Sequence, residues 1–503
     1  MKFLSTRGIS VAENSAQAIV KVLADDGGLV VPEFFPDLSG KINEMLSQDY
    51  AERACTVISS FLEEYDKEEL LSACKSAYQR FEDNDGATLV KLDDNFFILE
   101  LFHGPTLAFK DVALTLLPYL LRKGANLCGV KEEILILVAT SGDTGKAALE
   151  GFKDADGIKI CVFYPTGGVS DMQKKQMATQ EGDNVNVVAV KGNFDDCQTA
   201  VKKIFSDKDV ARELKENGVV LSSANSINFG RLVPQVTYYF SAYCDLLNSN
   251  QIKMGDKVDF CVPTGNFGNI LAGYYAKKMG LPVGKLICAS NENNVLTEFF
   301  RTGNYDANRE FFKTTSPSMD ILISSNLERL IFEVSGRDAE LTKLRMDELK
   351  KYGKYAISEQ EKQKLLLEFF ADYCDESDCE YTISEIFNEF GYVADTHTAV
   401  AINTACEYAD ENEGFKNATV ILSTASPYKF PQSVYKAISG EIIGDAFKAT
   451  KKLYNETAAE IPEQILSLKN KEIRFTQVVD KNGIFNSVKD FLKKVILRKF
   501  QVR

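Results

Sequence analysis

The sequence predicts an α/β fold, and two observations carry that prediction. Apolar runs of strand length alternate with helix-like segments through the middle of the chain. Several of these runs end in loops of glycine, serine, threonine and asparagine, where ligands bind in such folds. The 503 residues are too many for one core, so two or three domains are expected.

The expected strands follow one another along the chain. They are EEILILVA (132–139), IKICVFYP (158–165), VNVVAVKG (185–192), KVDFCVP (257–263), LICASN (286–291) and ATVILST (418–424). Helix-like segments such as KAALEGFKD and ILAGYYAKKMG lie between them. Continuous apolar strands spaced by helices indicate a parallel sheet covered on both faces.

The flanking regions differ from this pattern. Residues 1–95 are mostly helical in pattern, and we take them as an N-terminal domain. Residues 96–430 form the central unit, which includes a helical, charge-rich segment at about 293–385. Residues 431–503 form a C-terminal helical extension whose basic end indicates a solvated amphipathic helix.

Composition excludes several classes of protein. The formal net charge of −14 argues against nucleic acid as a partner. No apolar run reaches 18 residues, and the N-terminus lacks the apolar core of a signal peptide, so neither a membrane partner nor secretion is expected. Eleven scattered cysteines without a CxxC pair, and only two histidines, give little support to a metal site. A reducing cytoplasm fits best.

Lys110 stands inside the apolar run FHGPTLAFKDVAL (102–114). Desolvation there disfavours the ammonium ion and leaves a nucleophilic amine that can form a Schiff base. Two other interpretations remain open at this point. The first is an ordinary solvated charge, and the second is one half of a buried ion pair with Asp111.

The loop ATSGDTGKAA (139–148) joins a strand to a helix. Backbone N–H groups at a helix N-terminus bind anions, and Thr140, Ser141 and Thr144 add hydroxyl donors for a carboxylate or phosphate. The alternative is a capped turn with Asp143 or Thr144 as the N-cap.

The loop PTGNFGNI (263–270) has the same setting, and Gly265 and Gly268 let backbone amides approach a phosphate. It is neither a Walker loop nor a GxGxxG fingerprint, so it predicts a phosphate other than that of a nucleoside triphosphate or dinucleotide.

Two further polar patches complete the set. In ILSTASPYKF (421–430), Ser423, Thr424 and Ser426 either meet a ring nitrogen or cap a turn. In SSANSINFGRLVPQ (222–235), Asn225 and Arg231 form an anion clamp, unless Arg231 is a surface arginine. A desolvated lysine, a phosphate loop, a second anion loop and a hydroxyl at a strand end together match what pyridoxal 5'-phosphate requires.

The motifs HGPTLAFKD (103–111), ATSGDTG (139–145), PTGNFGN (263–269), LSTASPYKF (422–430) and DGGLVVPE (26–33) resemble those of the threonine synthase family, in its long bacterial and fungal branch. The similarity covers most of the chain and includes the opening MKFLSTRG. This family has the tryptophan-synthase-β type of fold, so the resemblance implies two doubly wound parallel-sheet domains with pyridoxal phosphate between them.

The resemblance implies a role for each motif. Lys110 carries the cofactor as a Schiff base and then moves the Cα and Cβ protons. Asp143 lies near the cofactor's 3-oxygen, and Thr424 faces the pyridine nitrogen. The remaining residues bind anionic groups: the cofactor phosphate is held by Gly265, Asn266, Phe267, Gly268 and Asn269, the substrate carboxylate or phosphate by Thr140, Ser141 and Thr144, and the substrate phosphate by Asn225 and Arg231. His103 positions phosphate or the Schiff base, or is a packing residue.

The implied reaction converts O-phospho-L-homoserine and water to L-threonine and phosphate, in a monomer or homodimer. Two positions depart from the family pattern: Ser426 replaces a histidine, and Thr396 replaces a proline next to His397. His397 is either functional or a packing residue. If the missing histidine moves protons, the alternative is a phospho-lyase that gives 2-oxobutyrate, phosphate and ammonia. A sensor that only binds the cofactor fits the Lys110 motif with its two anion loops less well. A serine or threonine dehydratase fits less well because the Arg231 patch indicates a phosphorylated substrate.

Overall fold

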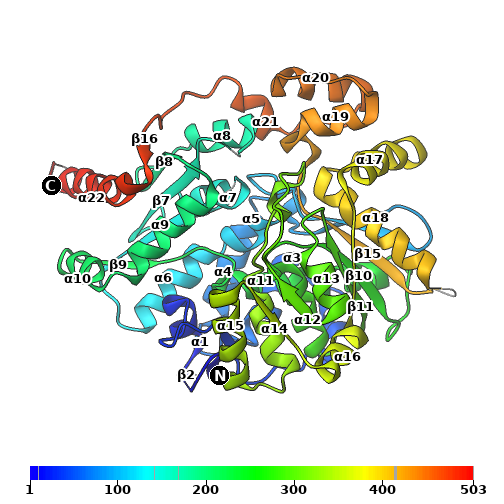
Figure 1. Ribbon diagram of the computed structural model, residues 1–503, viewed down its shortest axis with the longest axis horizontal. Helices are drawn as coiled ribbons and strands as arrows, with labels where there is room; N and C mark the ends of the chain where they lie inside the picture. Colours follow the sequence, from blue (N-terminus) through cyan, green and yellow to red (C-terminus); the bar gives the residue numbers. More distant parts are fainter. Residues whose placement is uncertain (10, 141, 168, 413–415, 502–503) are drawn as a thin grey trace.

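The computed structural model describes residues 1–9, 11–140, 142–167, 169–412 and 416–501. Two sheets dominate it (Figure 1). The six-stranded sheet has the order β14-β11-β10-β15-β5-β4, and only β4 runs antiparallel to its neighbour. The five-stranded sheet has the order β16-β8-β7-β6-β9 and is parallel throughout. The predicted class, α/β with two parallel-sheet domains, is therefore confirmed.

The bounds of the strands in the six-stranded sheet are β14 Phe369–Tyr373, β11 Val283–Ser290, β10 Val258–Pro263, β15 Ala418–Ser423, β5 Phe96–Glu100 and β4 Thr88–Lys91. Those of the five-stranded sheet are β16 Val478–Asp480, β8 Val185–Lys191, β7 Ile158–Pro165, β6 Glu133–Ala139 and β9 Val219–Ser222. All six predicted strands are present, and β4, β5, β9, β14 and β16 are additional to the prediction.

Helices lie on both faces of the sheets (Figure 1). Those of the central region are α5 Lys110–Leu114, α6 Leu117–Leu127, α7 Asp143–Phe152, α8 Asp171–Ala178, α9 Phe194–Ser206, α10 Lys208–Glu216, α11 Phe229–Asn248, α12 Gly268–Lys278, α13 Val295–Thr302, α14 Leu327–Val334, α15 Ala339–Tyr352, α16 Glu359–Glu368, α17 Glu376–Phe390 and α18 Thr396–Glu411. One cluster of buried apolar side chains includes Ile136 and Val162 from one sheet and Phe260 and Leu286 from the other. The two sheets therefore share a core, which fixes their strand ends relative to each other.

The N-terminal region combines helices with a small sheet. Its helices are α1 Ser15–Lys21, α2 Ile42–Met45, α3 Tyr50–Ser59 and α4 Lys67–Tyr78, and its strands are β1 Phe3–Ser5, β2 Val11–Ala12 and β3 Val30–Pro32. The sequence indicated helices here, and the short strands escaped because two or three residues show no periodicity. β4, at residues 88–91, already belongs to the six-stranded sheet.

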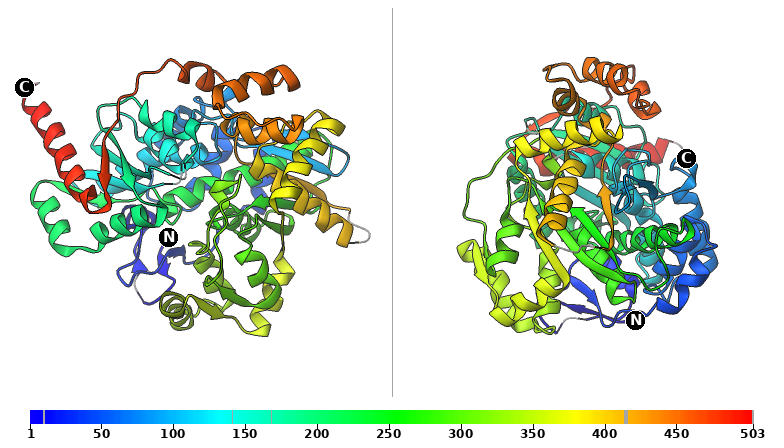
Figure 2. Two further views of the ribbon diagram at one scale, coloured as in Figure 1. Left: turned by 45° about the horizontal axis from the view of Figure 1, so that its top comes forward. Right: turned by 90° about the vertical axis from the view of Figure 1, so that its right-hand side faces the viewer.

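The C-terminal extension crosses from one sheet to the other (Figures 1 and 2). It contains α19 Pro431–Ser439, α20 Ala446–Thr457, α21 Glu463–Leu468 and α22 Ile484–Gln501. Between α21 and α22, β16 adds to the edge of β8, with Val478 opposite Ala189. α22 is amphipathic and buries Ile484 and Val488 against the five-stranded sheet. Within the described residues, no helix is long and apolar enough to cross a membrane.

Candidate active site

Lys110 lies on the connection between the two sheets. The chain leaves β5, turns at Gly104 and reaches α5, whose first residue is Lys110. Leu107 adopts a left-handed φ of 62° in this turn, which is uncommon for a branched side chain and is held by surrounding contacts. The N–H of Phe109 donates to the carbonyl of Thr424 (2.9 Å), and the N–H of Ser426 donates to the carbonyl of Leu107 (3.1 Å). The strand end after β15 thus fixes the backbone before Lys110.

The Lys110 amine is buried, with only 9% of the residue exposed. Its Nζ lies 3.6 Å from Asp143 Oδ2 and donates to Ser318 Oγ at 3.2 Å. Burial lowers the pKa of Lys110 to about 8; the Asp143 carboxylate opposes this shift, while Arg231 and Lys429 add to it. Asp111 instead accepts hydrogen bonds from the N–H and hydroxyl of Thr106, so the ion pair between Lys110 and Asp111 does not form.

Lys429 is a member of this site that the sequence analysis missed. It is 0% exposed, and its Nζ lies 2.9 Å from Asp143 Oδ1 and donates to the carbonyl of Thr106 at 2.8 Å. Gln173 Nε2 donates to the same carboxylate oxygen of Asp143. Burial alone would raise the pKa of Asp143, but Lys429 and Lys110 outweigh it and hold that pKa below its ordinary value. A permanent carboxylate therefore lies between two buried lysines.

The loop after β10 presents open hydrogen-bond donors. Phe267 takes a left-handed φ of 60°, and α12 begins at Gly268. The N–H groups of Asn266, Phe267 and Gly268 donate to no residue that the structure describes. Asn269 accepts from the hydroxyls of Tyr238 and Tyr239, but its buried Nδ2 has no partner within the same residues. Buried donors are rarely left unpaired, so this loop fits an anion.

Neighbouring segments hold this loop in place. Ser324 Oγ donates to the carbonyl of Gly265 (2.7 Å), and Asn326 Nδ2 donates to the carbonyl of Asn266 (2.9 Å). A Cβ on Gly265 would lie 2.7 Å from the carbonyl oxygen of Ser318, so only glycine fits there without a shift. A Cβ on Gly268 would lie 3.8 Å from Ser226, which places the segment of Asn225 beside the loop.

The loop after β6 is closed on itself. Thr140 Oγ1 accepts from the N–H groups of Gly142 and Gly145, both at 2.9 Å. The N-cap of α7 is Gly142, and Asp143 is the first helical residue, so neither Asp143 nor Thr144 caps this helix. Thr144 is half-buried, and Ser141 lies outside the described residues. Of the two interpretations of this loop, the capped turn describes its backbone, with Thr140 as the acceptor.

Arg231 is a buried cation, not a surface arginine. It is 4% exposed on the first turn of α11, and its NH1 donates to the carbonyl of Ala224 (2.8 Å). Within the part of the chain that the structure describes, no carboxylate pairs with it. Burial lowers its pKa to about 10, and its charge acts on Lys110. Asn225 is half-buried in the loop before α11.

His103 has both ring nitrogens occupied. Nδ1 lies 2.6 Å from Glu82 Oε2, and Nε2 lies 2.7 Å from Glu100 Oε2. Burial alone would lower the pKa of His103, but Glu100 and Glu82 outweigh it and raise that pKa. Both ring nitrogens therefore meet carboxylates in this structure, and a role of His103 at phosphate or the Schiff base stays a prediction.

Ser426, which departs from the family pattern, lies close to this site together with Thr424 and His397. Thr424 is buried directly after β15. Ser426 Oγ accepts from the N–H of Tyr428 (3.3 Å), so its hydroxyl caps a turn. The ring of His397 lies 5.0 Å from that of Phe430, which brings the second histidine to the same strand end.

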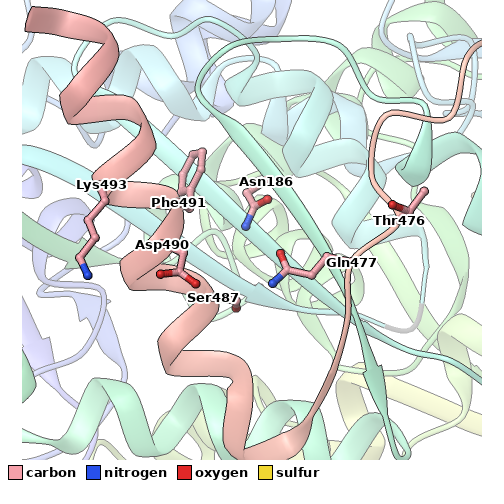
Figure 3. Close-up of a pocket in the computed structure, with 7 residues that line it drawn as sticks. All are labelled: Asn186, Thr476, Gln477, Ser487, Asp490, Phe491 and Lys493. Atoms are coloured by element: carbon pink, nitrogen blue, oxygen red, sulfur yellow. The ribbon is translucent and has the colours of Figure 1, made fainter.

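A separate cavity of about 500 Å³ lies between α22 and β8 (Figure 3). Its lining residues are Asn186, Thr476, Gln477, Ser487, Asp490, Phe491 and Lys493. None of the predicted site residues lines it, and the clustered charges around Lys110 define the better candidate for chemistry.

Comparison with known proteins agrees with this fold. A family model described as pyridoxal-phosphate dependent enzyme matches residues 87–425. Models of the threonine synthase N terminus and the threonine synthase C-terminal region match residues 2–78 and 398–491. The class that the fold and the lysine site define is thus that of the pyridoxal-phosphate-dependent enzymes.

Individual relatives narrow the class. Threonine synthase of Pseudomonas aeruginosa is 40% identical and covers 88% of this chain and 91% of its own. Threonine synthase of Saccharomyces cerevisiae is 36% identical, and the match covers 98% of this chain and 99% of that protein. The crystal structure of pyridoxal-phosphate-bound threonine synthase from Brucella melitensis superposes with a TM-score of 0.86 at 37% identity, over 98% of this chain and 99% of that one. The chain belongs to the threonine synthase family.

Threonine synthase-like 1 of Homo sapiens is 43% identical over 84% of this chain. The match covers 58% of that longer protein, so this chain spans less than two thirds of its length.

Proposed function

We propose that this chain is a pyridoxal-phosphate-dependent threonine synthase that converts O-phospho-L-homoserine and water to L-threonine and phosphate. The observation that carries the substrate assignment is Arg231, a buried guanidinium beside Lys110 with no carboxylate partner in the described residues. Burying a cation without a partner lowers stability by roughly several kcal/mol. A phosphate ester bound in the site would offset that cost.

The residues present fit the cofactor. The open N–H groups after β10 and the unpaired Nδ2 of Asn269 suit its phosphate. Lys110 Nζ, with a pKa of about 8, is partly neutral near pH 7 and can bond to its carbonyl carbon. Thr424, at the end of β15, would face the ring nitrogen, and Asp143 would face the 3-oxygen. When bound, pyridoxal phosphate supplies an electron-withdrawing ring that stabilises negative charge at the substrate Cα.

The chain's own groups then divide the work. Arg231 and Asn225 bind the substrate phosphate, and the hydroxyls of Thr140 and Thr144 donate to the substrate carboxylate. Thr140 Oγ1 accepts from two N–H groups but keeps its own hydrogen for donation. With its amine free, Lys110 Nζ would take the Cα proton and later move a proton at Cβ. Ser141 would add a third hydroxyl to this loop.

The test is a product analysis. The holoenzyme is incubated with O-phospho-L-homoserine, and threonine, phosphate, 2-oxobutyrate and ammonia are measured. Threonine equal to phosphate supports the proposal, and L-threonine or L-serine alone should give no keto acid. Equal amounts of 2-oxobutyrate and phosphate would replace it with the phospho-lyase reaction. No phosphate release from cofactor-loaded protein would rule out the substrate.

Arg231→Met tests the carrying observation. We expect KM for O-phospho-L-homoserine to rise about 10²-fold, the effect of removing one partner of a charged contact. Arg231→Lys should recover part of this loss, because it keeps the charge without the fork. An unchanged KM in Arg231→Met would show that phosphate binds elsewhere.

A further inference from the structure

The segment from Thr314 to Asp320 reaches the reacting amine. It lies within the charge-rich region 293–385, to which no role was assigned from the sequence. Its 3-10 turn, η3 (Pro317–Met319), carries Ser318. Ser318 Oγ accepts from Lys110 Nζ at 3.2 Å and donates to Asp143 Oδ2 at 3.3 Å. One neutral hydroxyl therefore bridges the amine and its carboxylate.

A histidine fixes this serine from behind. The N–H of Ser318 donates to His397 Nε2 at 3.2 Å. Because Nε2 accepts, the ring proton is on Nδ1, which donates to Asp395 Oδ1 at 2.8 Å. Asp395 also accepts from the N–H of His397 and from the hydroxyl of Thr398. His397 is 2% exposed, so this relay is shielded from water.

Other contacts anchor the same segment. Asn291 Nδ2 donates to Ser316 Oγ (3.0 Å), and Thr396 Oγ1 donates to the carbonyl of Thr315 (2.8 Å). The carbonyl of Ser318 lies against Gly265 in the loop after β10. The segment is thus fixed to the ends of β10 and β11 and to the start of α18. These contacts also fix the position of the Ser318 hydroxyl.

We infer that Ser318 is a further catalytic residue of the Lys110 site, and that His397, oriented by Asp395, is its positioning residue. This rests on the proposed function of Lys110. A hydroxyl both accepts and donates. While Lys110 is protonated, Ser318 accepts from Nζ and donates to Asp143. When Nζ has lost its proton, Ser318 turns its hydrogen to the nitrogen lone pair, so Nζ stays aimed at the same point in both states.

The first test compares Ser318→Ala with Ser318→Thr. In the alanine variant we expect kcat for O-phospho-L-homoserine to fall about 10²-fold, as for a positioned proton-transfer group, with KM within about twofold. The midpoint of the pH-dependent change in cofactor absorbance should shift by about one pH unit. Ser318→Thr should keep kcat within about fivefold of the parent. Parental kcat and midpoint in Ser318→Ala would overturn the inference.

The second test separates positioning from packing. His397→Gln places an acceptor near the former Nε2, whereas His397→Phe fills the space without one. We expect the glutamine variant to retain most of kcat and the parental absorbance midpoint, and the phenylalanine variant to behave like Ser318→Ala. Equal behaviour of the two would remove His397 from the inference. If His397→Phe does not fold, His397→Gln alone decides: a parental absorbance midpoint supports the inference, and a shifted midpoint contradicts it.

Ser335→Ala is the matched control. Ser335 lies in the same region and donates to the carbonyl of Phe332, so its loss should change neither readout. Lys110→Ala tells the two proposals apart. If that variant keeps the cofactor absorbance and turnover, the proposed function fails. If it loses both while Ser318→Ala is unchanged, only the present inference fails.

Discussion

Two loops of this protein share one sequence pattern but differ in the hydrogen bonding of their backbones. Both join a strand to a helix with glycines and small polar residues, one after β6 and one after β10. In the first, Thr140 accepts from the backbone and closes the loop. In the second, the N–H groups of Asn266, Phe267 and Gly268 and the Nδ2 of Asn269 have no partner among the described residues. The difference teaches that this pattern leaves its backbone N–H groups free for an anion only where no side chain of the loop accepts from them.

The largest effect is expected from Lys110→Ala, at the point between the two loops. The variant loses the nucleophile that bonds the cofactor, so activity should fall by about 10⁴-fold or more and the cofactor's visible absorbance should disappear. Absorbance spectra and product analysis of the purified variant measure both. Lys448→Ala, at a lysine on α20, is the control and should be normal. Normal turnover in Lys110→Ala would end the mechanism.

The open loop is tested by Asn269→Asp. The change keeps an acceptor for Tyr238 and Tyr239 but replaces the unpaired donor with negative charge. We expect cofactor affinity to fall about 10- to 100-fold, measured by titration of the apoenzyme. Asn388→Asp, at an exposed position, makes the same charge change and should have no effect. Equal affinity in both variants would mean that the loop does not hold phosphate.

A change of pH tests the lowered pKa of Lys110, which lies between the loops. With a pKa of about 8, about a tenth of the amine is neutral at pH 7 and about nine tenths at pH 9. Because the neutral form is the nucleophile, cofactor uptake by the apoenzyme should speed up about tenfold over this range and then level off. Stopped-flow absorbance measures the rate. A rate that still rises steeply above pH 10 would indicate an ordinary lysine.

The smallest effect on the cofactor is expected in the closed loop. Thr140→Val keeps the shape of the side chain but leaves the N–H groups of Gly142 and Gly145 without their acceptor. The free energy of unfolding should fall by about 1–3 kcal/mol, measured in urea, while cofactor affinity stays within about twofold. The reverse result, weak cofactor binding with an unchanged free energy of unfolding, would indicate that the loop after β6 holds the cofactor.

The sequence predicted the strands that are long and apolar, and it missed strands of other kinds. β7 coincides with its prediction at 158–165, because eight buried residues form one continuous run. β9 and β14 are short and only partly buried, so their partners in the sheet define them more than their own pattern does. The predicted family is confirmed by the relatives that match the full length of the chain. The domain boundaries at 95 and 430 stay predictions.

The site was predictable where a motif is local and hidden where it is assembled at long range. Lys110 was found from its apolar neighbours, and Lys429 has the same signal between Tyr428 and Phe430, which a search for buried lysines would have caught. Ser318 gave no such signal. It meets Lys110 across 208 positions of the chain, and its backbone contact with His397 on α18 is one that no local pattern encodes. The roles assigned to the individual site residues stay predictions.

The strand β16 has a consequence for the solution behaviour of the protein. It occupies the outer edge of β8, with Val479 opposite Val190. An uncovered parallel strand offers a row of free N–H and C=O groups to any other chain. A chain shortened before residue 478 would therefore expose the unpaired edge of β8 and self-associate, even with the site around Lys110 intact. The C-terminal extension acts in this respect as a guard against aggregation.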